Sequence, residues 1–180
     1  MAHDQTTGAG ATSDEAIKTY VMGLQNAHAL EKQAIQLINR QLERIDHYPE
    51  VAAALRKHHA ETEGQIGRIE AMLHELGSDA SKLKDLATQM AGNLAALGHT
   101  VMPDEILKNH FANCAFEAFE MATYKSLIAM ARTTGHAAHV PMLEANLREE
   151  EATFQTLQGM TADLSAKFLQ RIGAGQKADR

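Results

Sequence analysis

The sequence predicts an all-α protein, a four-helix bundle built from two antiparallel helical hairpins. Proline is rare, with three residues in 180, and tryptophan is absent, whereas Ala, Leu, Glu, Gln and Met, which favour helices, are frequent. Apolar residues recur at alternating steps of four and three along four long stretches, as they do on the buried face of a helix. Proline and glycine lie between these stretches, where helices begin and end.

Composition limits the class of protein. The chain has 180 residues, of which 44% are hydrophobic and 22% charged, which suits one globular domain with its own core. The formal charge of −6 and the lack of a Lys/Arg cluster argue against a nucleic-acid partner. The single cysteine, Cys114, excludes an intramolecular disulfide and suits a reducing compartment. No signal peptide and no apolar run of about 20 residues is found, so we expect a cytoplasmic protein without a membrane partner.

The first hairpin is predicted from residues 13 to 76. A capping-box pattern at residues 12–15 starts its first helix, which we expect to run to Asp46 after a disordered tail at residues 1–12. Pro49 starts the second helix, and Gly77 ends it after Leu76. The apolar stripe of the first helix comprises Ile17, Val21, Leu24, His28, Glu31, Ile35, Ile38, Leu42 and Ile45.

The second hairpin follows a long connection, residues 78–102. Its third helix is expected at residues 103–132 and its fourth from Val140 to about residue 172, with Gly135 between them and a polar tail at residues 173–180. Neighbouring antiparallel helices are usually joined by about 2–8 residues, so this connection is long enough to cross the bundle and set the third helix parallel to the second. It has the pattern of an extra short helix at residues 81–97. We therefore expect a single domain at residues 13–172, with the crossover at 78–102.

Glutamates interrupt the apolar stripes at matched heights. Glu31 and Glu150 stand within mostly apolar seams, where an ionised carboxylate costs several kcal/mol unless it is paired or coordinated. The midpoint of Glu31 and Glu61 is residue 46, in the first turn, and that of Glu120 and Glu150 is residue 135, in the second. Both pairs are 30 residues apart, so each acid lies about 22 Å from its turn. All four are therefore expected in one layer.

Four carboxylates in one layer require neutralisation, because each close pair costs about 4 kcal/mol even at an effective dielectric near 20. Two divalent ions match four negative charges, and a carboxylate-rich site with some imidazole suits iron or manganese better than zinc. We therefore predict a site for two Fe ions per chain, with Mn as an alternative. Its predicted ligands are Glu31, Glu61, Glu120 and Glu150, with His28, His58 and Glu117 as secondary candidates one turn away. The sequence singles out no organic cofactor and no further catalytic residue.

The same segments carry a family resemblance. Residues 29–33, 58–65, 116–124 and 147–152, four motifs in order within residues 16–158, resemble the YciE/YciF-like branch of the ferritin-like superfamily. The resemblance implies a ferritin-like four-helix bundle, a dinuclear iron-type site, a homodimer and a role in bacterial stress responses. Ferritin-like sites usually carry Glu-x-x-His on two helices, but here Gly64 and Thr153 stand at the histidine positions. The site is then unusually carboxylate-rich, recruits His28, His58 or Glu117, or binds metal weakly.

Two function classes follow. The leading hypothesis is a di-iron or di-manganese oxidoreductase of ferroxidase or peroxidase type, which oxidises Fe(II) or reduces peroxide or dioxygen. The alternative is a metal-free helical-bundle stress protein that acts through protein–protein interaction. The alternative to a ligand role for His28 is a purely structural histidine in the core. We expect the histidines at loops and helix ends to lie on the surface: His47, His99, His136 and His139. Tyr124 is expected in the core.

Overall fold

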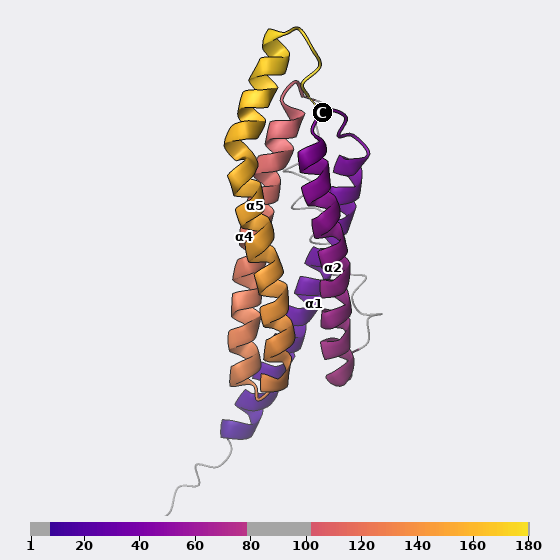
Figure 1. The fold of residues 1–180 in the computed structure, drawn as a ribbon. Coiled ribbons are helices and arrows are strands. Elements are labelled where there is room, and N and C mark those ends of the chain that lie inside the picture. Colours follow the sequence, from indigo (N-terminus) through magenta and orange to yellow (C-terminus); the bar gives the residue numbers. More distant parts are fainter. Residues whose placement is uncertain (1–7, 79–101, 180) are drawn as a thin grey trace, which may run out of the picture.

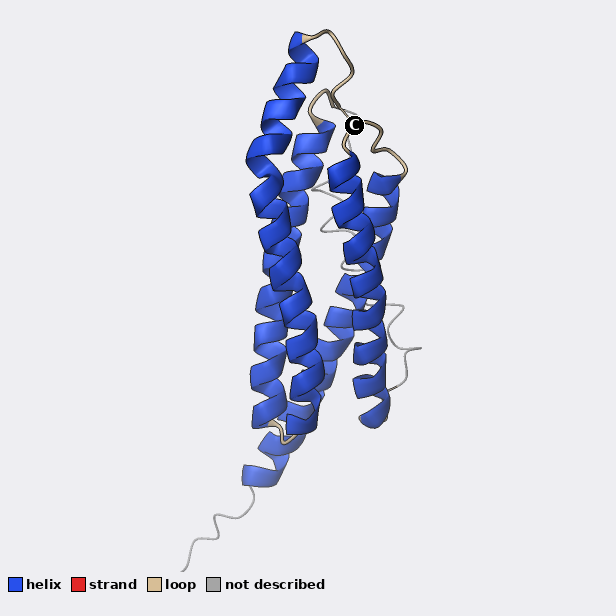
Figure 2. Ribbon diagram, viewed as in Figure 1, coloured by secondary structure: helices blue, strands red, loops and turns tan. Residues whose placement is uncertain are grey.

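The computed structural model describes residues 8–78 and 102–179, with side chains from residue 14 onward. Four long helices make up the described chain (Figure 1): α1 (Gly8–Leu42), α2 (Pro49–Glu75), α4 (Glu105–Thr133) and α5 (Val140–Gly173). A 3-10 turn, η3 (Ala137–His139), precedes α5. These two described ranges contain no strand (Figure 2). The all-α prediction is confirmed.

The helices form two antiparallel hairpins packed side by side. α1 packs on α2 and α4 on α5, while α1 also faces α4 and α2 faces α5. The tail after α5 contacts the starts of both α2 and α4: the Tyr48 hydroxyl donates to the Ala178 carbonyl at 2.7 Å, and the Ile106 amide donates to the Asp179 carbonyl at 2.9 Å. α2 and α4 therefore begin at the same end of the bundle and run parallel, as a crossing connection requires (Figure 1). The short helix expected at residues 81–97 lies outside the described residues.

The helix boundaries largely follow the sequence signals. Gly77 and Gly135 adopt left-handed backbone conformations with φ of 65° and 81°, which glycine tolerates at helix ends. α1 differs, because it begins at Gly8 rather than at the capping residues 12–15. No proline stands upstream of those residues to prevent one further turn. α1 also ends at Leu42 rather than Asp46, although the Ile45 amide still donates to the Gln41 carbonyl at 3.0 Å.

The apolar core is divided into two clusters. Near the α4–α5 turn, apolar residues of all four helices pack together, and a second cluster lies near the opposite end and includes Ala178 of the C-terminal tail. The predicted polar tail is thus partly packed into the core. On each helix, the stretch between the two clusters contains buried polar side chains. Within the described chain, none of the helices combines the length and the apolar content that a membrane span requires.

Candidate metal centre

A buried polar layer separates the two apolar clusters. Its side chains lie three or four residues apart on each helix, so that they share the inward face. The layer contains three buried acids from the second hairpin, and one buried acid and one buried histidine from the first. The buried polar residues of the layer are Glu31 of α1, His58, Thr62 and Gln65 of α2, Glu117 and Glu120 of α4, and Glu150 and Thr153 of α5.

Four of these residues form a group that could hold a metal ion. His58, Glu117, Glu120 and Glu150 each offer one ligand atom, and these atoms lie within 4.8 Å of one another. His58 Nε2 is 3.2 Å from Glu117 Oε1 and 3.9 Å from Glu150 Oε2. All four side chains are almost entirely shielded from solvent. We refer to them below as the four-residue group.

The polar atoms of this group are largely unsatisfied. Among the described residues, both carboxylate oxygens of Glu120 and of Glu150, Oε2 of Glu117 and Nε2 of His58 have no hydrogen-bond partner. The 3.2 Å approach of His58 to Glu117 therefore lacks hydrogen-bond alignment. Leaving a buried polar atom unpaired costs about 1–3 kcal/mol, and more for a charge, so six such atoms facing one another indicate a site for a cation. The contact of His58 Nδ1 with Thr153 Oγ1, at 3.3 Å, helps to orient the ring.

Burial strongly perturbs the carboxyl groups. Desolvation, reinforced by neighbouring acids, raises the pKa of Glu117 to about 7, that of Glu31 to about 8 and that of Glu150 to about 9. The pKa of Glu120 lies well above its ordinary range for the same reasons. Without a cation, the layer therefore holds several protons near neutral pH, and a bound cation would replace them.

Glu31 and Glu61, the two predicted ligands of the first hairpin, flank the four-residue group without joining it. Glu31 is buried, and its Oε1 accepts a hydrogen bond from the Tyr124 hydroxyl. Glu61 is 22% exposed and its Oε1 pairs with Lys57 on the next turn of α2. Within the described chain, the second oxygen of each acid is buried and has no partner. Their charges still act on the group, since Glu31 raises the pKa of Glu120 and Glu61 that of Glu117.

Two histidines lie elsewhere than the sequence predicted. His28 was a candidate ligand, and His139 was expected on the surface. His28 Nε2 lies 2.8 Å from Glu70 Oε1, a half-exposed carboxylate outside the polar layer. His139 is buried, and the prediction that it lies on the surface was wrong. Its ring nitrogens contact the Tyr20 hydroxyl at 2.9 Å and Glu75 at 3.0 Å, so a side chain at a helix boundary is enclosed by partners from the other hairpin.

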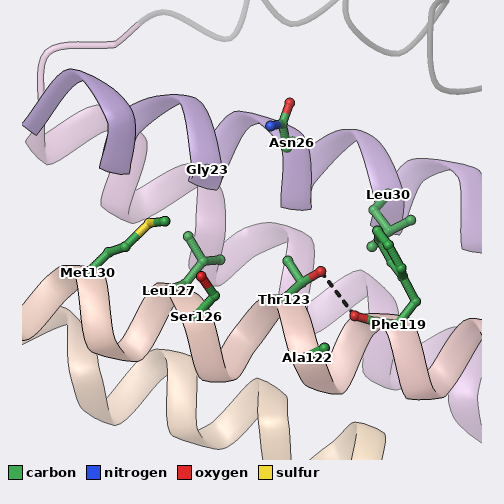
Figure 3. Close-up of a pocket in the computed structure, with 9 residues that line it drawn as sticks. All are labelled: Gly23, Asn26, Leu30, Phe119, Ala122, Thr123, Ser126, Leu127 and Met130. Carbon is green, nitrogen blue, oxygen red and sulfur yellow. Dashed lines mark hydrogen bonds between the residues drawn. The ribbon is translucent and has the colours of Figure 1, made fainter. Parts of the chain in front are cut away.

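Two cavities lie near the layer. A pocket of about 10 Å³ is lined in part by His58, Glu117, Asn113 and Phe116, which is about the space for one water molecule. A groove of about 500 Å³ runs along the outer face between α1 and α4 (Figure 3). It is lined by apolar, small and neutral side chains such as Leu30 and Phe119, and no His, Asp, Glu or Cys is among them. The groove is therefore not the candidate metal centre.

A bundle of two antiparallel hairpins in which α2 and α4 run parallel, with inward carboxylates at mid-height, has the architecture of ferritin-like proteins. The chain belongs to the family described as a domain of unknown function, DUF892, whose profile matches residues 15–170.

Three solved structures share this fold. A protein of Xanthomonas campestris is 25% identical, with a TM-score of 0.74, and the match covers 88% of this chain and 99% of that one. YcfI of Rhodopseudomonas palustris, called a structural protein, is 24% identical, with a TM-score of 0.61 and coverages of 79% and 92%. The E. coli stress protein YciF is 22% identical, with a TM-score of 0.64 and coverages of 82% and 95%. The predicted YciF-like fold is confirmed.

Proposed function

We propose that this protein binds two metal ions per chain, Fe natively with Mn as the alternative, and that it oxidises Fe(II) or reduces peroxide or dioxygen. The observation that supports the proposal most is the set of six unpartnered buried ligand atoms in the four-residue group. A helical bundle gains nothing in stability from such a layer unless a cation satisfies it. Iron or manganese, when bound, would supply the redox or Lewis-acid chemistry.

The donor set suits these metals. His58, Glu117, Glu120 and Glu150 would hold the first ion, and Glu31 and Glu61 supply further carboxylates for the second. Five carboxylates against two divalent ions leave the layer close to neutral. Oxygen donors with a single imidazole favour iron or manganese over zinc.

The surrounding residues control what reaches the layer. The apolar clusters above and below exclude bulk water from the carboxylates. The pocket of about 10 Å³ beside His58 and Glu117 has room for about one water molecule. The similarity to YciF, which is described as a stress protein, supports a role in stress. The lone cysteine supports a cytoplasmic location.

Metal counting tests this function. Apo-protein is equilibrated with Fe(II) under anaerobic conditions, and bound iron is counted, after which oxygen or peroxide is admitted and the loss of Fe(II) is followed with a ferrous chelator. We expect two ions per chain and accelerated loss of Fe(II). Glu120→Gln should abolish at least one equivalent, whereas Glu63→Gln, an exposed acid of α2, should behave like the wild type. Saturation below one ion per chain would refute the proposal.

The groove between α1 and α4 supports a second candidate, an interaction protein whose partner is a second copy of the chain. Phe111 and Phe119 of α4 are about half exposed, and Phe119 lines the groove (Figure 3). An exposed phenylalanine beside an apolar groove is a surface on which a second chain could pack. Light scattering should find a homodimer that Phe119→Ser dissociates. A melting temperature indifferent to metal and chelator, combined with this result, would favour the interaction role over metal binding.

A further inference from the structure

A chain of hydrogen bonds connects Glu31 to the surface of the bundle through all four helices. The Tyr124 hydroxyl of α4 donates to Glu31 Oε1 of α1 and accepts from Asn146 Nδ2 of α5 at 2.9 Å. Asn146 Oδ1 in turn accepts from Arg68 Nε of α2. Arg68 pairs with Glu149, and both are partly exposed. Because the Tyr124 hydroxyl accepts from Asn146, its own proton is directed at Glu31.

This arrangement distinguishes Glu31 from the other acids of the layer. Among the described residues, neither oxygen of Glu120 or Glu150 has a hydrogen-bond partner, so both acids are free to ligate. Glu61 is restrained only by the exposed, same-helix Lys57, a kind of ion pair that contributes little. Oε2 of Glu31 also has no partner among the described residues, but its Oε1 is restrained by a buried hydroxyl that two further residues hold in place. Release of Glu31 therefore requires a buried hydrogen bond to break.

We propose that Tyr124, fixed by Asn146 and Arg68, is a positioning residue that keeps Glu31 out of the four-residue group. The first metal ion then binds His58, Glu117, Glu120 and Glu150 without Glu31. The second ion binds more weakly, because Glu31 must first move from the position in which Tyr124 holds its Oε1, outside the four-residue group. This inference rests on the proposed binding of two ions, and it adds their order and the residue that imposes the order.

The small number of aromatic residues in the chain makes tyrosine absorption a direct spectroscopic signal for the release of Glu31. The chain has three tyrosines and no tryptophan, so its near-ultraviolet difference spectrum reports mainly on tyrosine. Loss of the Glu31 acceptor should shift the Tyr124 absorption. Apo-protein is titrated with Mn(II), which contributes little absorption of its own, and heat of binding is recorded in parallel. Tyr20→Phe is the matched control, because Tyr20 is another fully buried tyrosine with a hydroxyl contact, to His139.

We expect a first equivalent without a tyrosine signal and a second, weaker equivalent with one. The signal should persist in Tyr20→Phe and disappear in Tyr124→Phe. Tyr124→Phe should also tighten the second equivalent by about tenfold, which corresponds to about 1.4 kcal/mol. Asn146→Leu, which keeps the tyrosine but removes its support, should tighten the second equivalent by a smaller factor and retain the signal.

Each alternative result has a distinct meaning. A wild-type protein that binds no Mn(II) or Fe(II) would refute the proposed function itself. Two bound ions with a tyrosine signal in the first equivalent, or with no signal at all, would overturn the inference and leave the function standing. Weaker second binding in both Tyr124→Phe and Asn146→Leu would also overturn it, because Tyr124 would then support Glu31 as a ligand rather than restrain it.

Discussion

The apo-protein should become less stable as the pH rises from about 6 to about 8. Glutamate has an ordinary pKa of 4.5, whereas folding raises the pKa of Glu117 to about 7, that of Glu31 to about 8 and that of Glu150 to about 9. The folded state therefore binds protons that the unfolded state has released. This contribution to stability is fully present below pH 4.5 and is lost as the pH rises through the folded pKa values.

The size of the effect follows from the number of protons. At about pH 6 the unfolded glutamates are ionised, whereas Glu31, Glu150 and most of Glu117 hold a proton in the folded state. Each proton contributes about 1.4 kcal/mol per pH unit, so these three together give a slope of about 3–4 kcal/mol per unit. Glu120 adds to the slope in the same direction. An exposed acid with a lowered pKa, such as Glu50, loses its contribution only at acidic pH and does not oppose the slope here.

Urea denaturation of chelator-treated protein at several pH values between about 5.5 and 8.5 measures this slope. Repeating the series with excess Mn(II) should give a smaller slope or an inverted one, because the metal displaces the protons. Glu63→Gln should follow the wild type, since that acid is exposed. A free energy of unfolding that stays constant or increases between about pH 6 and pH 8 without metal would refute the description of the layer as buried and protonated.

Four further changes have defined outcomes. Glu120→Gln replaces a fully buried, unpartnered acid with a neutral isostere, so it should stabilise the apo-protein at about pH 8 by more than about 1 kcal/mol and weaken metal binding more than about tenfold. Removal of residues 174–180 deletes the carbonyls that accept from Tyr48 and Ile106 and should cost about 2 kcal/mol in urea denaturation. Gly135→Ala should cost about 1–2 kcal/mol because φ is 81° there, whereas Gly67→Ala, with open space in a helix, should stabilise by up to about 1 kcal/mol.

The sequence predicted the hairpins and the height of the polar layer because both depend on local patterns. Helical periodicity, Pro49 and the glycines at 77 and 135 determine arm lengths, and equal arms place Glu120 and Glu150 together. Which residue on a turn points inward depends on helix phase. His58 and Glu117, considered only secondary candidates, complete the four-residue group, whereas Glu61 stands one position off its stripe and pairs with Lys57. His58 has the same helix phase as the buried residues Leu55, Thr62 and Gln65 of α2, so giving phase priority over symmetry would have ranked it first.

Other features depend on contacts between distant segments. The tail was predicted only to be polar, but its backbone carbonyls accept hydrogen bonds from Tyr48 and Ile106. Backbone acceptors are present at every residue regardless of its type. Asn146 gave no signal of its own, because its role comes from lying between Tyr124 and Arg68. His139 is likewise buried by Tyr20 and Glu75, which come from the other hairpin. Such contacts follow from docking rather than from local sequence.

The candidate centre lies where the two hairpins meet. His58 comes from the first hairpin, while Glu117, Glu120 and Glu150 come from the second. Contacts within each hairpin outnumber those between hairpins, so fewer contacts hold the hairpins to each other than hold each hairpin together. Mutual repulsion of the carboxylates weakens it further as they ionise. A cation bound by both hairpins reverses that repulsion, and at a concentration 100 times its dissociation constant it adds about 2.7 kcal/mol to the folded state. Metal binding should therefore act chiefly on hairpin docking, and amide hydrogen exchange should slow most along the facing surfaces of α2 and α5.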